Sequence, residues 1–278
     1  MNSDTGNSPV TGRLGYLVPS AKRPCNYMFQ PPDGVPSENC EYEDVPCAIH
    51  DARRISSALA LELNGFELVD MPAGLSEFYD DRLVKEIYYP ELEALALRMT
   101  GGRQARVFDH LYRQRDGARP TLSFGRDGDG TQASAVGRVH NDYTEQSGQR
   151  RRELVFADGS ADSPFVILNF WRPVHHAAID TPLAVCDTRS FAMQDWIAGD
   201  IIYPDRTGEI YLARHSAAHR WYYYPSMMPS EVLVFKTYDS RLDLPARMTA
   251  HCAFDDPTAP ADAPARRSIE ARCLVVLD

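Results

Sequence analysis

Two side chains with metal-binding chemistry stand two residues apart in the sequence, His140 and Asp142. Residues at this spacing share one face of an extended strand, so an imidazole nitrogen and a carboxylate oxygen can reach one ion. The third ligand must come from elsewhere, and His251 in a late β-rich segment is the first candidate, with His219 as the alternative. Two histidines and one carboxylate leave three octahedral positions open, which is typical of non-haem iron(II) sites that use dioxygen. The competing interpretation is a strand-end turn in which Asp142 accepts backbone hydrogen bonds.

A second pair of side chains suits an anion. Arg266 and Ser268 open the last predicted strand and share one face, 15 residues (266 − 251) after His251. A guanidinium grips a carboxylate at two points and a hydroxyl adds a third, which is what the far carboxylate of an iron-bound 2-oxo acid requires. Arg272 lies on the same face and is the second candidate. A solvated, charged strand edge is the competing interpretation.

Composition narrows the class of protein. The chain has 278 residues, 29 basic and 39 acidic, and a net charge of −10. Nucleic-acid binding is disfavoured because phosphate recognition requires a basic surface. No apolar run reaches the roughly 18 residues of a membrane span, and no signal peptide is visible. None of the six cysteines forms a C-x-x-C pair, so we expect reduced thiols and a cytoplasmic protein.

The sequence pattern in the first part of the chain predicts helices, which we expect to pack against a later β region. Residues 1–45 are rich in Pro, Gly, Asn and Ser and predict an irregular N-terminal arm. We expect residues 46–278 to form one domain, with a helical part over 50–102 and a β core over 103–278. Within the helical part, helices are expected at 51–64 and 78–100. Gly65 should cap the first, Pro90 should interrupt the second and Gly101 should end it.

Short β-rich runs separated by Gly and Pro fill the remainder. No crossover helix pattern lies between them, which disfavours a parallel α/β sheet and favours a sandwich or jelly roll. The runs cover 104–109, 121–125, 134–142, 165–171, 183–187, 200–203, 219–224, 231–238, 248–254 and 269–277.

Several segments together resemble a known family. They are HNDYT at 140–144, NFWRP at 169–173, HRWYYYP at 219–225, EVLVFKTYDS at 231–240, HCAFDDP at 251–257 and RRSIEAR at 266–272. From about residue 45 to the end, the chain resembles the hydroxylase/desaturase family that includes the cephamycin methoxylation component and gibberellin-desaturase-like proteins. The family is similar to the Fe(II)/2-oxoglutarate-dependent dioxygenases. The resemblance implies a mainly β fold with flanking helices around a double-stranded β-helix (jelly roll, cupin-like) core.

The same resemblance implies roles for particular residues. His140, Asp142 and His251 would bind Fe(2+), and an arginine of RRSIEAR would hold 2-oxoglutarate, the cosubstrate used with O2. Arg267 stands where the family more often has an acidic residue, so the choice among Arg266, Arg267 and Arg272 stays open.

Further candidates lie in the predicted strands. Asn169 and Trp171 share a face, on which Asn169 would donate to a cosubstrate carboxylate and Trp171 would line the pocket. Arg172 would hold a substrate acid or form an ion pair. Tyr222 and Tyr238 would border the substrate, with core packing as the alternative.

The resulting hypothesis is an oxygenase that abstracts hydrogen from a small molecule of specialised metabolism. Hydroxylation, desaturation and oxidative ring formation all remain open. The alternatives are a non-catalytic accessory subunit of a biosynthetic enzyme pair and a cupin-like metal hydrolase, since zinc accepts the same ligands. A homodimer or a biosynthetic partner enzyme is a further possibility.

Overall fold

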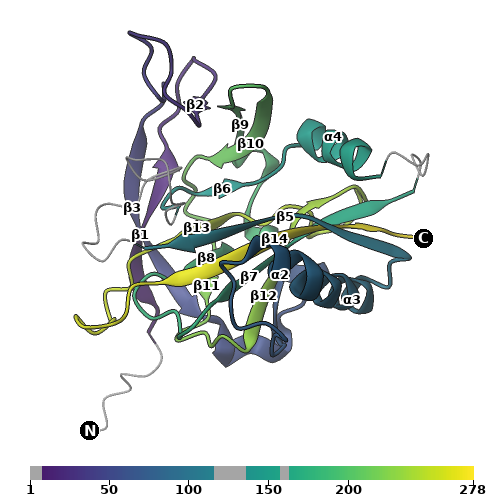
Figure 1. The fold of residues 1–278 in the computed structure, drawn as a ribbon. Coiled ribbons are helices and arrows are strands. Elements are labelled where there is room, and N and C mark those ends of the chain that lie inside the picture. Colours follow the sequence, from purple (N-terminus) through teal and green to yellow (C-terminus); the bar gives the residue numbers. More distant parts are fainter. Residues whose placement is uncertain (1–7, 116–135, 157–162) are drawn as a thin grey trace, which may run out of the picture.

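Two β-sheets face each other in the computed structural model, which describes residues 8–115, 136–156 and 163–278 (Figure 1). The nine-stranded sheet has the order β1-β3-β11-β8-β13-β6-β10-β9-β2, and the five-stranded sheet has the order β4-β12-β7-β14-β5. The first sheet comprises β1 Val10–Leu17, β2 Cys25–Tyr27, β3 Tyr42–Asp51, β6 His140–Asn141, β8 Leu183–Cys186, β9 Trp196–Ile202, β10 Thr207–Ala213, β11 Trp221–Tyr223 and β13 His251–Ala253. The second comprises β4 Phe66–Asp70, β5 Gln104–Gln114, β7 Phe165–Pro173, β12 Glu231–Asp239 and β14 Arg267–Val276.

Most neighbouring strands in both sheets are distant in sequence, as in a jelly roll, and most pairs are antiparallel. The predicted mainly β class and jelly-roll core are therefore confirmed. All six cysteines are free, and no described helix has the length and apolarity that a membrane span requires.

Helices cover the outer face of the five-stranded sheet. α2 Asp81–Leu83, a π-helical turn η2 Val84–Tyr88 and α3 Tyr89–Thr100 follow one another without interruption. Pro90 stands in the first turn of α3, where its missing N–H is not needed, and Gly101 ends the helix with a φ of 67°. Leu92 and Leu95 pack in one cluster with the apolar side chains of β7 and β14.

The segment expected to be one helix at 51–64 forms two short turns. These are the 3₁₀ helix η1 Ala52–Ala58 and the single turn α1 Leu61–Asn64. Gly65, with a φ of 90°, caps the second as predicted. Two further 3₁₀ turns precede β9, η3 Thr188–Ser190 and η4 Met193–Asp195.

Two regions differ from the expectation. Residues 10–17 pair along their whole length with 42–49, so β1 and β3 join the nine-stranded sheet where the composition predicted an irregular arm. Helix α4 Glu145–Val155 was not expected because it is polar nearly all round, and it begins at an N-cap on Thr144. The strand expected at 121–125 lies outside the described residues.

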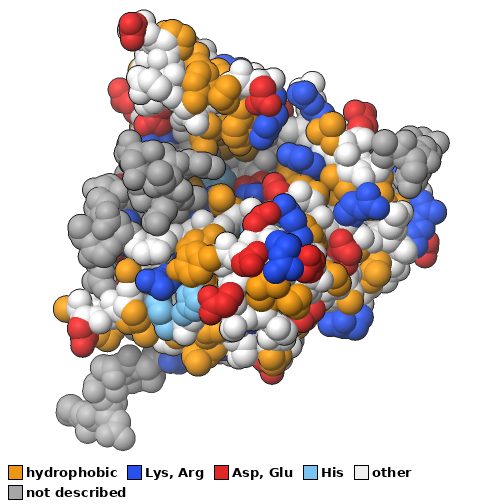
Figure 2. Space-filling view, viewed as in Figure 1, with side chains coloured by type: hydrophobic (Ala, Val, Ile, Leu, Met, Phe, Trp, Pro, Cys, Tyr) orange, Lys and Arg blue, Asp and Glu red, His pale blue; other side chains and the backbone are white. Residues whose placement is uncertain are grey.

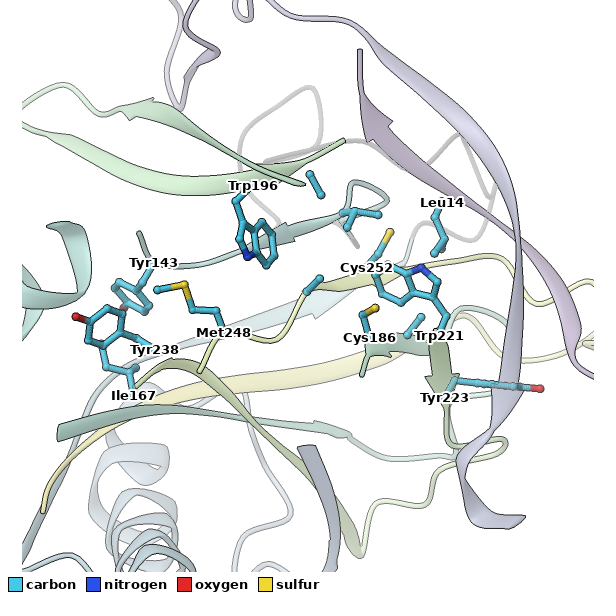
Figure 3. Close-up of a cluster of buried hydrophobic side chains, with 14 of the residues drawn as sticks. Leu14, Tyr143, Ile167, Cys186, Trp196, Trp221, Tyr223, Tyr238, Met248 and Cys252 are labelled. Atoms are coloured by element: carbon cyan, nitrogen blue, oxygen red, sulfur yellow. The ribbon is translucent and has the colours of Figure 1, made fainter. Parts of the chain in front are cut away.

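The centre of the nine-stranded sheet is covered on both faces. Every residue of β6, β8 and β13 is buried. Figure 3 shows Trp221, Cys186 and Cys252 with Leu14, in the cluster of buried side chains that also contains Ile167 of the facing sheet. Burial on both faces fixes the short strands that carry His140 and His251.

Candidate metal centre

The two histidines are cross-strand neighbours. His140 on β6 lies directly opposite His251 on β13, and their ring centroids are 4.2 Å apart. The Nδ1 atom of His140 is 2.8 Å from the carbonyl oxygen of Arg138, and that of His251 is 3.1 Å from the carbonyl oxygen of Thr249. A carbonyl only accepts, so Nδ1 of each ring carries the proton and Nε2 presents its lone pair, as in metal-binding histidines.

Asp142 completes the group from the end of β6. Its Oδ1 atom is 3.7 Å from Nε2 of His140 and 4.0 Å from Nε2 of His251, and the three ligand atoms lie within 4.8 Å of one another. Its Oδ2 atom accepts hydrogen bonds from Nε of Arg272 (2.7 Å) and Nδ2 of Asn169 (3.2 Å). One carboxylate oxygen therefore faces the histidines while the five-stranded sheet holds the other.

Electrostatics keep this group ready for a cation. Burial, together with the charge of His251, lowers the pKa of His140 to about 3, and burial also lowers the pKa of His251. Burial alone would raise the pKa of Asp142, but the Arg272 cation and the two histidines outweigh it and hold that pKa below its usual value. Neutral imidazoles and an ionised carboxylate are the protonation states that bind a divalent metal, so these donors fit one.

Arg272 is the centre of a buried ion network. Besides Asp142 it contacts Asp109 (3.2 Å) and Glu270 (2.8 Å), and Glu270 also accepts from Arg113 at 3.0 Å. Burial alone would raise the pKa of Glu270, but Arg113 and Arg272 lower it to about 2. Asp109, Arg113 and Glu270 were not among the residues predicted from the sequence to serve the site. The signal was available, because alternate residues of the last strand are charged or polar where a buried strand should be apolar.

Arg266 and Ser268 are buried without a full set of partners. One guanidinium nitrogen of Arg266 donates to the carbonyl oxygen of Thr181 at 3.0 Å, and the group lies over the ring of Trp171 at 5.6 Å. Among the described residues, neither Nε of Arg266 nor Oγ of Ser268 has a hydrogen-bond partner. Burial and then the nearby Arg113 cation lower the pKa of Arg266 to about 10. A buried cation beside an unsatisfied hydroxyl fits an oxyanion ligand, since unpartnered buried donors are otherwise costly.

Arg172 lies on the opposite face of β7 from Trp171. Its guanidinium packs over the rings of Phe78 (5.8 Å) and Tyr88 (5.6 Å) in the helical layer and donates to the carbonyl oxygen of Pro229. Strand alternation therefore places it away from His140, Asp142 and His251.

The two tyrosines expected near the substrate pack against other aromatic rings, with Tyr238 buried and Tyr222 partly buried. Tyr222 lies 6.0 Å from Phe66 between ring centroids. Tyr238 stacks on Phe165 at 5.2 Å, and its hydroxyl accepts from Gln149. Neither lines the cavity described below.

His219, the alternative third ligand, is held elsewhere. Tyr16 Oη lies 2.9 Å from its Nδ1, and Asp195 Oδ2 lies 3.3 Å from its Nε2. Both ring nitrogens have protein partners, so the structure brings His251 and not His219 to His140.

A cavity of about 640 Å³ opens beside the metal-binding group. His140, Asp142 and Arg272 line it, with α4 on one side and the β9–β10 hairpin on the other. Figure 2 shows Lys and Arg side chains interspersed with Asp and Glu side chains on this face of the molecule. Arg266, Ser268 and Trp171 are not among the residues that line it.

Comparison with known proteins places this geometry in a family. The model of the Oxidoreductase/YMDC permease-like domain matches residues 14–276. The hydroxylase/desaturase efuI of Hormonema carpetanum is 32% identical over 92% of this chain and 95% of that protein. The Fe(II)/2-oxoglutarate-dependent dioxygenase nvfI of Aspergillus novofumigatus is 29% identical over 94% of each chain. The solved structure of the iron and alpha-ketoglutarate-dependent endoperoxidase NvfI superposes with a TM-score of 0.83 at 26% identity, covering 97% of this chain and 98% of that one.

These likenesses extend over nearly the whole chain and agree with the two-histidine, one-aspartate group. They confirm the prediction of an iron- and 2-oxoglutarate-dependent oxygenase of secondary metabolism that acts on a small molecule. The chain belongs to the hydroxylase/desaturase family of Fe(II)/2-oxoglutarate-dependent dioxygenases.

Proposed function

We propose that His140, Asp142 and His251 hold the iron, and that Arg266 and Ser268 hold the distal carboxylate of 2-oxoglutarate. The observation that carries the second assignment is a pair of buried donors at the start of β14, Nε of Arg266 and Oγ of Ser268, which have no hydrogen-bond partner among the described residues. A carboxylate would satisfy both and would compensate the buried positive charge.

Neighbouring arginines are less suited to this role. Arg272 already contacts three protein carboxylates, including Asp142. Arg267 follows Arg266 in the strand, so its side chain emerges on the other face, and it is partly exposed. Arg266 is therefore the arginine of this strand with a donor to offer to a ligand.

When bound, the iron supplies dioxygen activation, coupled to conversion of 2-oxoglutarate and O2 into succinate and CO2, and hydrogen abstraction from the substrate. The protein's side chains set the conditions for this. Arg272 and Asn169 hold Oδ2 of Asp142, which leaves Oδ1 to face the histidines. Trp171 covers the Arg266 guanidinium, and a water-poor environment strengthens its attraction for a carboxylate.

The substrate would occupy the 640 Å³ cavity, a size suited to a small organic molecule. Relatives carry the names hydroxylase/desaturase and endoperoxidase. Abstraction of a hydrogen atom from the substrate is a first step that can lead to each of these kinds of product. We propose the same first step here, with the product determined by how the cavity holds the substrate.

Iron binding provides the test. Asp142→Ala and His251→Ala should each lose stoichiometric Fe(II) after anaerobic loading, whereas His219→Gln, at a histidine with protein partners, should retain it. Succinate release should follow the iron content. Full iron retention by either ligand variant, with the fold intact by circular dichroism, would overturn the assignment of the ligands.

A further inference from the structure

We propose that the substrate is an apolar small molecule bearing an oxyanion, such as a carboxylate, which Arg150 of α4 binds at the mouth of the cavity. The proposal rests on the function above, because it takes the cavity beside His140 as the substrate side. It adds the chemical class of the substrate, which the family does not fix.

One face of α4 forms a wall of the cavity. Gln146, Arg150 and Leu154 recur every four residues and so lie on one face of the helix, with Ser147 and Arg151 beside them. The opposite wall is the β9–β10 hairpin. A guanidinium nitrogen of Arg150 reaches to 3.5 Å from the carbonyl oxygen of Thr207 in that hairpin, so its charge lies between the two walls.

The acidic residues of the cavity lining already have basic partners. Asp109 and Asp142 contact Arg272, while Asp200 and Glu209 contact Arg23. These pairs leave the acidic groups little capacity to neutralise the arginines of α4.

The arginines at the mouth are less well compensated. Among the described residues, no carboxylate lies within 4 Å of the guanidinium of Arg150 or Arg151. Arg151 instead lies over the ring of Phe108 at 4.9 Å. Arg206 on the hairpin has Asp205 at 3.6 Å and lies over Tyr203 at 4.1 Å. The mouth therefore presents positive charge to an incoming ligand.

Apolar side chains line the same space. Met28, Tyr143, Ile201 and Ile210 contribute from three different segments, and Leu154 on α4 is 69% exposed, one turn after Arg150. An exposed leucine beside an arginine that has no acidic partner in the described part of the chain fits a molecule with an apolar body and an anionic end.

A matched pair of fluorescent probes tests this without knowledge of the natural substrate. The probes are 8-anilinonaphthalene-1-sulfonate and the neutral N-phenyl-1-naphthylamine, which share a ring system and differ in the anion. Dissociation constants are measured for the wild type, for Arg150→Gln and for Arg98→Gln, an exposed arginine on α3 that serves as the control. The variant Ile210→Trp, which fills the cavity, should weaken binding of both probes and so locates them there.

The wild type should bind the sulfonate more tightly than the neutral probe. Arg150→Gln should weaken sulfonate binding about fivefold, as expected for a partly exposed ion pair, and leave the neutral probe unchanged. Arg98→Gln should change neither constant. Equal affinities for the two probes in the wild type, or an unchanged preference in Arg150→Gln, would contradict the proposal. These measurements do not involve iron, so they can fail while the iron-binding test succeeds, and the reverse.

Discussion

Arg266, the residue just before β14, and Arg272 within β14 share one side of the extended chain, and their surroundings differ sharply. Arg272 contacts Asp142, Asp109 and Glu270, and these carboxylates raise its pKa although burial alone would lower it. Arg266 has no ion pair with a carboxylate among the described residues, and burial lowers its pKa to about 10. The same residue type therefore serves two purposes along one strand. Arg272 orders a protein carboxylate, whereas Arg266 retains the capacity to bind a ligand's carboxylate.

Removing Arg272 should have the largest effect. Arg272→Gln leaves Asp142, Asp109 and Glu270 without their shared cation, and breaking a buried ion pair typically costs about 3–5 kcal/mol. We expect the midpoint of urea unfolding to fall sharply, together with weaker Fe(II) binding. A variant as stable as the wild type would show that the network does not hold the site together.

Removing Arg266 should weaken cosubstrate binding without lowering stability, in contrast to the loss of stability expected on removing Arg272. Arg266→Gln should weaken 2-oxoglutarate binding roughly 100-fold, since a buried charged hydrogen bond to a ligand is lost. The free energy of unfolding of the ligand-free protein should stay the same or rise, because a buried charge that has no ion pair among the described residues disappears. Isothermal titration and urea unfolding measure the two effects. Arg267→Gln is the matched control, and if it weakens binding instead, the neighbouring arginine is the clamp.

A pH series tests how burial of His140, next to Asp142, affects the stability of the metal-free protein. Burial lowers the pKa of His140 from 6.5 to about 3, so the unfolded chain takes up a proton in that range that the folded chain does not. The stability of the metal-free protein should therefore be complete above pH 6.5 and fall as the pH drops, by up to about 1.4 kcal/mol per pH unit. His140→Gln should flatten this slope in chemical denaturation. An equal slope in the variant would assign the effect to other groups.

Among these substitutions, removing the Ser268 hydroxyl should have the smallest effect on 2-oxoglutarate binding and stability. Ser268→Ala removes one neutral donor to the proposed carboxylate, worth about 1 kcal/mol, so 2-oxoglutarate should bind roughly fivefold more weakly. Stability should hardly change, because the hydroxyl has no hydrogen-bond partner among the residues that the structure describes. Unchanged 2-oxoglutarate affinity would limit the clamp to Arg266.

Local sequence patterns correctly predicted much of the secondary structure. Gly65 and Gly101 end helical turns as their positions predicted, and most expected β runs are strands. The β1–β3 pair was not predicted, because strand pairing joins residues far apart in the chain and the surrounding Pro- and Gly-rich segments dominate the composition. α4 was missed for a related reason: its polar sequence has no apolar stripe, and its place at the wall of a cavity depends on the rest of the fold.

For the site, the sequence by itself determined which residues share a face, since alternation along a strand is a property of the backbone. This rule placed Arg266, Ser268 and Arg272 together and brought His140 near Asp142. The tertiary structure decided that His251 lies opposite His140, that Arg272 binds Asp142 and that Arg266 is buried without an ion pair to a carboxylate of the described residues. Those outcomes depend on strand register and burial, which are set by contacts between segments more than 100 residues apart in the chain, as the Asp142–Arg272 pair (272 − 142 = 130) illustrates.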